Sequence, residues 1–309
     1  MRSSSGAIFG TIARLLIEED GATVVGAALS GDCKAVEHIA VDTVEGLEPL
    51  YGSKYVQSSV DASIYRDVKE KLRAGGTVFF TGTACQVAGL VSMLGPTRKQ
   101  GRLITAEVIC HGAPSPKLWR EWVGELEESA GSKLAHASFR DKRTGWNSYS
   151  TSYEFEDGKR ISHLASEDWY MRAFLNNASL RSSCFQCTSK GRSGADLTLG
   201  DYWGIQSIHK NAPFGKGASC VVAHTEAGRE ILGRISAAIE SDTTTFESIT
   251  SGNPSLTTST ARPDSYEDFQ AKLATGSIDE LRGAYPFKRP LLNRIASHVN
   301  AFINKVRYL

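Results

Sequence analysis

Hydrophobic and polar positions alternate between two periods in the first half of the chain. Apolar residues three or four apart, as at Ile8, Ile12 and Leu15, predict a helix that Asp20-Gly21 ends. Unbroken β-rich runs such as residues 77–80 are typical of buried parallel strands. These patterns predict helices over residues 8–20, 64–72, 87–94 and 116–126, and strands over 22–29, 77–80 and 103–109.

The order of these elements predicts the fold class. Strands and helices alternate up to about residue 134, which favours an α/β layer with a partly parallel sheet flanked by helices. Ser115-Pro116 is a strong helix start, because a capping hydroxyl is followed by proline at the first helical position. We therefore predict an N-terminal α/β part over residues 1–134.

The pattern changes to an α+β arrangement after residue 135. Asp157-Gly158 is a hairpin signal. A loop rich in glycine and serine is expected over residues 182–194. Strands are expected over residues 138–140, 149–155, 197–200 and 219–223, and helices over 169–175 and 226–239.

The last third of the chain contains two further features. Residues 240–265 are rich in Ser, Thr and Pro, which predicts a surface linker. Residues 291–306 form an amphipathic pattern, which we interpret as a helix docked on the body; a helix that binds a partner or a membrane surface is the alternative. The predicted parts are thus 1–134, 135–240 and 241–309.

Composition excludes several classes of protein. Of the 309 residues 41% are hydrophobic and 22% charged, which argues against disorder and coiled coil. The formal net charge of +1 gives no overall attraction for nucleic acid. No run of about 18 uncharged apolar residues predicts a membrane span. Without an export signal near the N-terminus, we expect a cytoplasmic protein whose thiols stay reduced.

The six cysteines are the informative residues. Cys184 and Cys187 form a C-x-x-C pair, and a tight turn can bring two such thiolates to one metal centre. A redox pair of the thioredoxin type would need a helix after the first cysteine, whereas a loop is expected here. Cys33 and Cys220 have plainer surroundings and are expected to be buried apolar residues.

Cys85 and Cys110 each follow a predicted parallel strand. The carboxyl ends of parallel strands lie at one edge of a sheet, where such folds bind their ligands. Together with the C-x-x-C pair these residues make a set of four thiolates. An iron–sulfur cluster, a zinc site and unconnected buried thiols all remain open at this point.

Several other segments are candidates for binding an anionic cofactor. Ser3-Ser4-Ser5-Gly6 precedes the first helix, where free N–H groups attract phosphate, although an ordinary helix cap is the alternative. Gly82-Thr83 has the same place before the helix that contains Gln86. The Gly200-Asp201 turn suits a planar ring or a sugar hydroxyl, or is simply a turn.

Three basic or titratable residues complete the candidates. Lys190 and Arg192 are predicted to face a phosphate or an acidic cofactor tail, with solvated loop charges as the alternative. His111 is a candidate catalytic proton donor beside a redox centre; a structural hydrogen-bond partner is the alternative.

Six motifs in register carry a family resemblance. They resemble the coenzyme F420 hydrogenase/dehydrogenase beta-subunit family. The motifs are residues 3–6 (SSSG), 52–58 (GSKYVQS), 82–90 (GTACQVAGL), 110–116 (CHGAPSP), 183–187 (SCFQC) and 196–204 (DLTLGDYWG).

The resemblance implies an oxidoreductase that carries FAD and a 4Fe–4S cluster and passes electrons to or from a substrate such as the deazaflavin F420. By the motif positions, Cys85, Cys110, Cys184 and Cys187 are the implied cluster ligands. The implied flavin contacts are Ser3, Ser4, Ser5, Gly6, Lys54, Thr83, Gly200 and Asp201. The residues already considered for an anionic cofactor add Gly82, Gln86, Lys190 and Arg192 to the cofactor-binding candidates.

This chain departs from the family pattern in two places. Relatives usually have a ferredoxin-like segment before the serine-rich motif, whereas here the first cysteine is Cys33. We therefore expect a separate ferredoxin-like electron carrier as partner, or a sequence that begins inside a longer one. Ala84 stands where relatives usually have proline, which loosens the turn but leaves the thiolate of Cys85 in place.

The sequence thus predicts a flavin- and cluster-dependent oxidoreductase that acts on F420 or another small organic substrate. The first alternative is a non-catalytic or accessory protein of surface-polysaccharide biosynthesis with a structural metal site, because many similar bacterial proteins are encoded among such genes. A glycan-acting transferase fits the α/β layers, but no pair of acidic residues suggests its general acid and base.

Overall fold

The computed structural model describes residues 3–209 and 217–287. The helix expected over residues 291–306 lies outside these ranges. Within them, no helix is both long and apolar enough to cross a membrane.

A six-stranded sheet forms one half of the molecule, with the strand order β2-β1-β3-β4-β8-β9. Its four central strands are parallel, and both edge strands are antiparallel to their neighbours. The α/β fold class with a partly parallel sheet is therefore confirmed. The strands are β1 (Thr23–Leu29), β2 (Val36–Val41), β3 (Thr77–Thr83), β4 (Arg102–Val108), β8 (Leu197–Asp201) and β9 (Ser219–Ala223).

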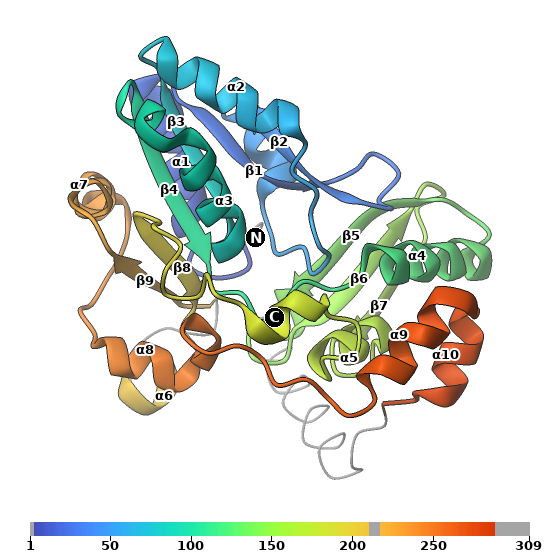
Figure 1. Cartoon of the computed structure of the whole chain (residues 1–309). Coiled ribbons are helices and arrows are strands. Elements are labelled where there is room, and N and C mark those ends of the chain that lie inside the picture. The colour runs from blue at the N-terminus through green and yellow to red at the C-terminus, as the bar shows by residue number, and fades with distance from the viewer. Residues whose placement is uncertain (1–2, 210–216, 288–309) are drawn as a thin grey trace.

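Helices cover both faces of this sheet (Figure 1). Phe79 and Phe80 of β3 are both fully buried, and they belong to different cores because adjacent strand residues point to opposite faces. The Phe79 face packs against α1 (Ile8–Asp20), the 3₁₀ helix η1 (Glu45–Leu50) and α7 (Glu226–Ile235). The Phe80 face packs against α2 (Ala62–Arg73) and α3 (Ala84–Leu94).

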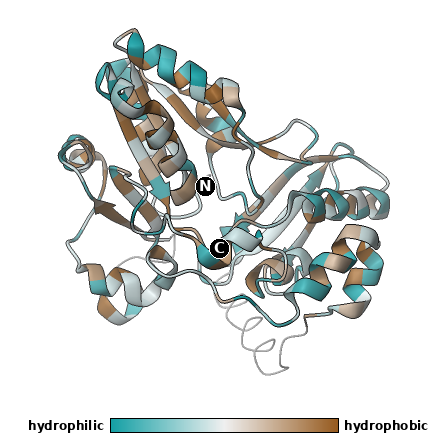
Figure 2. Ribbon diagram, in the orientation of Figure 1, coloured by the Kyte–Doolittle hydropathy of each residue, from teal (hydrophilic) through white to brown (hydrophobic). Residues whose placement is uncertain are grey.

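A three-stranded antiparallel sheet, β5-β6-β7, forms the other half. Trp119, Tyr153 and Tyr170 are fully buried at the centre of its large aromatic core. The outer surface of α4 is largely hydrophilic, as Figure 2 shows. The elements of this half are α4 (Pro116–Ala130), β5 (Leu134–Asp141), β6 (Ser150–Phe155), β7 (Arg160–Leu164), α5 (Trp169–Leu175), α9 (Tyr266–Thr275) and α10 (Ile278–Ala284).

The chain crosses between the halves more than once. α4 begins as predicted, with Ser115 as its N-cap and Pro116 in its first turn. After α5 the chain returns to the parallel sheet as β8 and β9, which follow the antiparallel strands in sequence. Short elements complete the fold: η2 (Gly95–Lys99), η3 (Lys142–Thr144), η4 (Ser182–Gln186), α6 (Ile205–Ile208) and η6 (Ser236–Ala238).

The linker prediction for residues 240–265 is wrong over its centre. This stretch contains α8 (Phe246–Gly252) and η7 (Pro254–Leu256), and both Ile249 and Leu256 are buried. Gly252 lies so close to the backbone of Trp203 that a side chain there would collide with it. These two widely spaced apolar residues hold the segment in place. The Ser- and Thr-rich composition around them gave no indication that the segment packs against a core.

Candidate functional site

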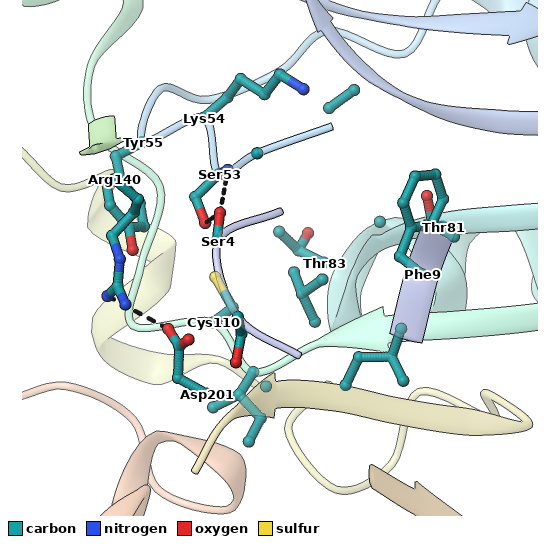
Figure 3. Close-up of a pocket in the computed structure, with 18 of the residues that line it drawn as sticks. Ser4, Phe9, Ser53, Lys54, Tyr55, Thr81, Thr83, Cys110, Arg140 and Asp201 are labelled. Atoms are coloured by element: carbon teal, nitrogen blue, oxygen red, sulfur yellow. Dashed lines mark hydrogen bonds and ion pairs between the residues drawn. The ribbon is translucent and has the colours of Figure 1, made fainter. Parts of the chain in front are cut away.

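A cavity of about 1710 Å³ lies between the two halves of the molecule. Figure 3 places Ser4 and Ser53 between a group formed by Arg140, Tyr55 and Asp201 and a second group that includes Thr83. The cavity is larger than the roughly 300–1,000 Å³ of most small-molecule sites, so it has room for more than one ligand.

The parallel strands place their following residues at this cavity. Thr83 ends β3, Cys110 follows β4, and Asp201 ends β8, and all three line the cavity. This is the position where open α/β sheets bind ligands, because the loops after parallel strands meet at one edge.

The serine-rich N-terminal segment is tied to the rest of the cavity wall. Ser4 Oγ accepts a hydrogen bond from the backbone N–H of Ser53 at 2.7 Å, and Ser5 Oγ donates to the carbonyl of Ala218 at 2.7 Å. The N-cap of α1 is Ala7, and no side chain caps this helix. The uncapped first turn lines the cavity, which gives it free N–H groups for an anion.

Thr83 and Gln86 form a polar corner at the start of α3. Gln86 Oε1 accepts from the backbone N–H of Thr83 at 2.9 Å, and Gln86 Nε2 donates to Ser58 Oγ at 2.8 Å. The side chain of Gln86 thus holds Thr83 in place. Gly82, Thr83 and Gln86 all line the cavity.

The motif cysteines gather at one edge of the cavity from three segments of the chain. Cys85, Cys110 and Cys184 line it, whereas Cys187 does not. Burial raises the pKa of Cys110 to about 12, and Cys184, Cys85 and Cys187 add to this rise. Among the described residues, no group of three or more His, Cys, Asp or Glu is placed to hold a metal ion. The thiols therefore interact electrostatically without forming the tight shell of a single ion.

Polar groups surround these thiols. Thr83 Oγ1 lies 3.2 Å from Cys85 Sγ, and the backbone N–H of Ala113 donates to Cys184 Sγ at 3.4 Å. Lys190 Nζ donates to the carbonyl of Cys110 at 2.7 Å and to that of Thr258 at 3.0 Å. A positive charge and an N–H donor beside sulfur favour its anionic form.

Lys190 and Arg192 do not line the cavity. The ammonium group of Lys190 is held by carbonyl groups next to the thiols, and Arg192 is exposed. The structure therefore does not place either residue beside a cofactor in this cavity. Cys33 and Cys220 are both buried, and burial raises the pKa of each thiol.

His111 lies in the cavity wall next to Cys110. Its Nε2 is 2.6 Å from Asn177 Oδ1, and its ring meets that of Phe174 edge to face. Burial lowers its pKa, although the contact with Asn177 opposes this effect. The imidazole is therefore held in one orientation and favours its neutral form.

Several cavity residues were missed at the sequence level. Arg140 belongs to β5, Lys142 follows β5, and Tyr149 directly precedes β6. The alternating pattern of a strand does not mark these residues as functional, because they line the cavity only through the arrangement of one sheet relative to the other. Lys54 was expected only from the resemblance; burial lowers its pKa to about 7.

A large cavity at the carboxyl ends of the parallel strands is where open α/β sheets bind their ligands. A family model of the C-terminal region of the coenzyme F420 hydrogenase/dehydrogenase beta chain matches residues 75–250, more than half of the chain. The chain therefore belongs to this family, as the motifs predicted.

A solved structure shares the fold. A chain of the F420-reducing [NiFe] hydrogenase complex from Methanosarcina barkeri aligns with a TM-score of 0.51 and 17% identity, over 92% of this chain and 86% of that one. No curated protein is similar enough to match. Membership of the family supports an oxidoreductase of this general type.

Proposed function

We propose that this protein is a flavin- and 4Fe–4S-dependent oxidoreductase. It passes electrons between a ferredoxin-like carrier and a small organic substrate, either F420 or another acceptor. The observation that carries the proposal is the convergence of Cys85, Cys110, Cys184 and Cys187, the first three of which line a cavity large enough for a flavin and a substrate together.

The thiol set fits an iron–sulfur cluster better than a single zinc ion. All four candidates are cysteines, which are the usual ligands of such clusters. A single zinc would need the four sulfurs about 2.3 Å from one point, and no such group exists among residues 3–209 and 217–287. A cluster carries its thiolates on separate iron atoms, so its ligands stand further apart. The N–H of Ala113 and the ammonium of Lys190 would stabilise the negative charge there.

The cavity beside the thiols suits FAD. The uncapped start of α1 offers N–H groups to a phosphate, and Thr83, which Gln86 holds in place, lies in the wall of the same cavity. When bound, a flavin exchanges single electrons with a cluster and pairs of electrons with an organic substrate. The residues assigned to hold it are Ser3, Ser4, Ser5, Gly6, Lys54, Gly82, Thr83, Gln86, Gly200 and Asp201.

His111 is assigned to proton delivery. It lies one residue from Cys110, lines the cavity, and is oriented by Asn177. A neutral imidazole that is held in place can relay a proton between solvent and a reduced substrate.

The test is anaerobic purification followed by metal and flavin analysis. We expect brown protein with iron and acid-labile sulfide each near about four per chain, and FAD released on denaturation. Reduced ferredoxin is then offered with F420 and, in parallel, with other organic acceptors. Colourless protein that contains zinc and no flavin would contradict the proposal and favour the accessory role in polysaccharide biosynthesis.

A further inference from the structure

Residues 258–260 lie between α8 and α9, in the stretch whose composition predicts a linker. Figure 1 shows them in the orange segment that joins these two helices. They belong to no helix or strand, and they lie beyond residues 75–250, which the family model matches. Each of them nevertheless makes a hydrogen bond to a segment that carries a motif cysteine.

Ser259 holds the second cysteine of the C-x-x-C pair. Its Oγ accepts a hydrogen bond from the backbone N–H of Cys187 at 3.0 Å and donates to the carbonyl of the same residue at 3.3 Å. A single hydroxyl group therefore pairs with both backbone polar groups of this cysteine. Cys184 is held differently, because its sulfur accepts from the N–H of Ala113, in the loop after β4, at 3.4 Å.

Thr260 holds the loop after β4. Its Oγ1 donates to the carbonyl of His111 at 2.6 Å. Asn177, whose Oδ1 lies 2.6 Å from His111 Nε2, donates from its Nδ2 to the carbonyl of Ala261 at 3.0 Å. Both the backbone and the ring of His111 are therefore linked to this segment, and His111 directly follows Cys110.

Lys190 joins the two loops through the same segment. Its Nζ donates to the carbonyl of Cys110 at 2.7 Å and to that of Thr258 at 3.0 Å. One ammonium group thus bridges the loop after β4, the loop of the C-x-x-C pair and residue 258. Hydrogen bonds from a charged donor are stronger than those between neutral groups, so this bridge adds to the hold of the two hydroxyl groups.

The sheet alone does not fix the distance between Cys110 and Cys187. Cys110 follows a parallel strand, whereas Cys187 follows the 3₁₀ helix η4, which belongs to no sheet. Groups outside a metal site that hold its ligands in place raise the affinity of the site. The hydrogen bonds of residues 258–260 give such support to both loops at once.

We propose that residues 258–260 form a clasp in which Ser259 and Thr260 are positioning residues for the cluster ligands Cys187 and Cys110. The clasp holds the loop of the C-x-x-C pair against the loop after β4 and so slows release of the cluster. The inference rests on the proposed function in taking these thiols as cluster ligands. The hydrogen bonds between the loops are independent of that assignment.

The experiment measures iron loss from the full-length protein, purified anaerobically and mixed with the chelator bipyridyl. The variants Ser259→Ala and Thr260→Val each remove one hydroxyl group, and Ser259→Thr and Thr260→Ser each keep it. Thr257→Val is the matched control, because Thr257 is exposed and its side chain makes no hydrogen bond within the described part of the chain. Urea denaturation of the same proteins measures their overall stability.

We expect the rate of iron loss to rise about tenfold in Ser259→Ala and about threefold in Thr260→Val. The two variants that keep a hydroxyl group and the control should lose iron at the rate of the unmodified protein. Rates that do not depend on these hydroxyl groups would overturn the clasp. A rise that only follows a lower free energy of unfolding would overturn it as well, since it would show a general structural role.

Amide hydrogen exchange separates the clasp from the proposed function. On the proteins as purified, the Cys187 amide should exchange faster in Ser259→Ala than in the unmodified protein and Thr257→Val, because its acceptor is lost. If the unmodified protein holds no iron, the proposed function is refuted and the exchange still tests the clasp. If iron is present but the Cys187 amide exchanges equally in all three proteins, the clasp is refuted and the proposed function stands.

Discussion

The two halves of this protein contribute to the cavity in different ways. In the parallel half, cavity residues such as Thr83 and Cys110 lie at the end of a strand or just after it. In the antiparallel half, cavity residues such as Arg140 belong to a strand itself. The parallel half thus offers thiols and backbone N–H groups from short loops, whereas the antiparallel half offers charged and aromatic side chains from a rigid sheet.

Because of this difference, we expect substitutions at the strand ends to affect ligand binding and substitutions in the antiparallel half to affect stability. Loops after strands carry few core contacts, so changes there should remove a bound group and leave the fold intact. The antiparallel half carries the largest aromatic core, and changes inside it should unfold the protein. The four predictions below test this separation.

The largest effect is expected from Cys110→Ala. Cys110 is a motif thiol in the cavity wall whose carbonyl is held by Lys190, so its loss should reduce bound iron from about four per chain to less than about one. Iron analysis and the visible absorption spectrum measure this, while circular dichroism checks the fold. Cys220→Ala is the control, because this buried thiol lies outside the set. Unchanged iron in Cys110→Ala would remove Cys110 from the ligands.

Trp119→Ala tests the other half. The Trp119 ring lies within 5.0 Å of those of Phe139 and Tyr170, and its Nε1 donates to the carbonyl of Cys33 at 2.7 Å. Removing it should lower the free energy of unfolding by about 3–5 kcal/mol, measured by urea denaturation. Phe246→Ala, at a side chain 47% exposed, should cost less than about 1 kcal/mol. Similar losses in both variants would contradict the central role of this core.

The same division explains what the sequence could predict. Periodicity and turn residues identified β3, β4, α3 and the start of α4, because buried parallel strands and capped helices depend on local sequence. The gathering of Cys85 and Cys110 at one sheet edge followed from the parallel order. The sheet edge together with the C-x-x-C pair already suggested a set of four thiolates, and the family resemblance implied that these four are cluster ligands.

The remaining features depend on contacts between distant segments. β2, α9 and α10 were not predicted, and α8 was taken for a linker. Arg140 becomes part of the site only because β5 faces the end of β8, where Asp201 lies. Lys190 follows the C-x-x-C pair, but the orientation of its side chain is fixed by hydrogen bonds to the carbonyl groups of Cys110 and Thr258. No local sequence pattern predicts these contacts between distant segments.

Lys54→Met tests how a buried lysine in the cavity wall makes the stability of the protein depend on pH. Burial lowers the pKa of Lys54 to about 7, although its Nζ keeps the carbonyl groups of Pro49 and Tyr51 as acceptors. Above pH 7 the unfolded chain holds a proton at this lysine that the folded chain has lost, since a free lysine has a pKa of about 10.4. The free energy of unfolding therefore rises with pH above pH 7, by up to about 1.4 kcal/mol per pH unit. Below pH 7 Lys54 is protonated in both the folded and the unfolded chain, and the full destabilisation from burying its charge remains.

The free energy of unfolding of Lys54→Met minus that of the unmodified protein should accordingly be largest at pH 7 and shrink toward pH 8.5. Urea denaturation at both values measures it. The comparison stops at pH 8.5 because the thiols of the unfolded chain ionise above that value. A difference independent of pH would mean that Lys54 stays charged in the folded protein.

The smallest effect is expected at the junction of the two halves, where α4 starts four residues after the cavity residue Gly112. Ser115 Oγ accepts from the backbone N–H of Leu118, and the N–H of Ser115 donates to the carbonyl of Ser179 at 2.8 Å. Ser115→Ala removes only the cap and should cost about 1 kcal/mol in urea denaturation. Ser115→Asp keeps an acceptor and should stay near the unmodified protein. Both variants keep the backbone contact to Ser179, so their iron and flavin contents should equal those of the unmodified protein. A loss of iron or flavin would show that the capped start of α4, and not the strand end alone, positions Cys110.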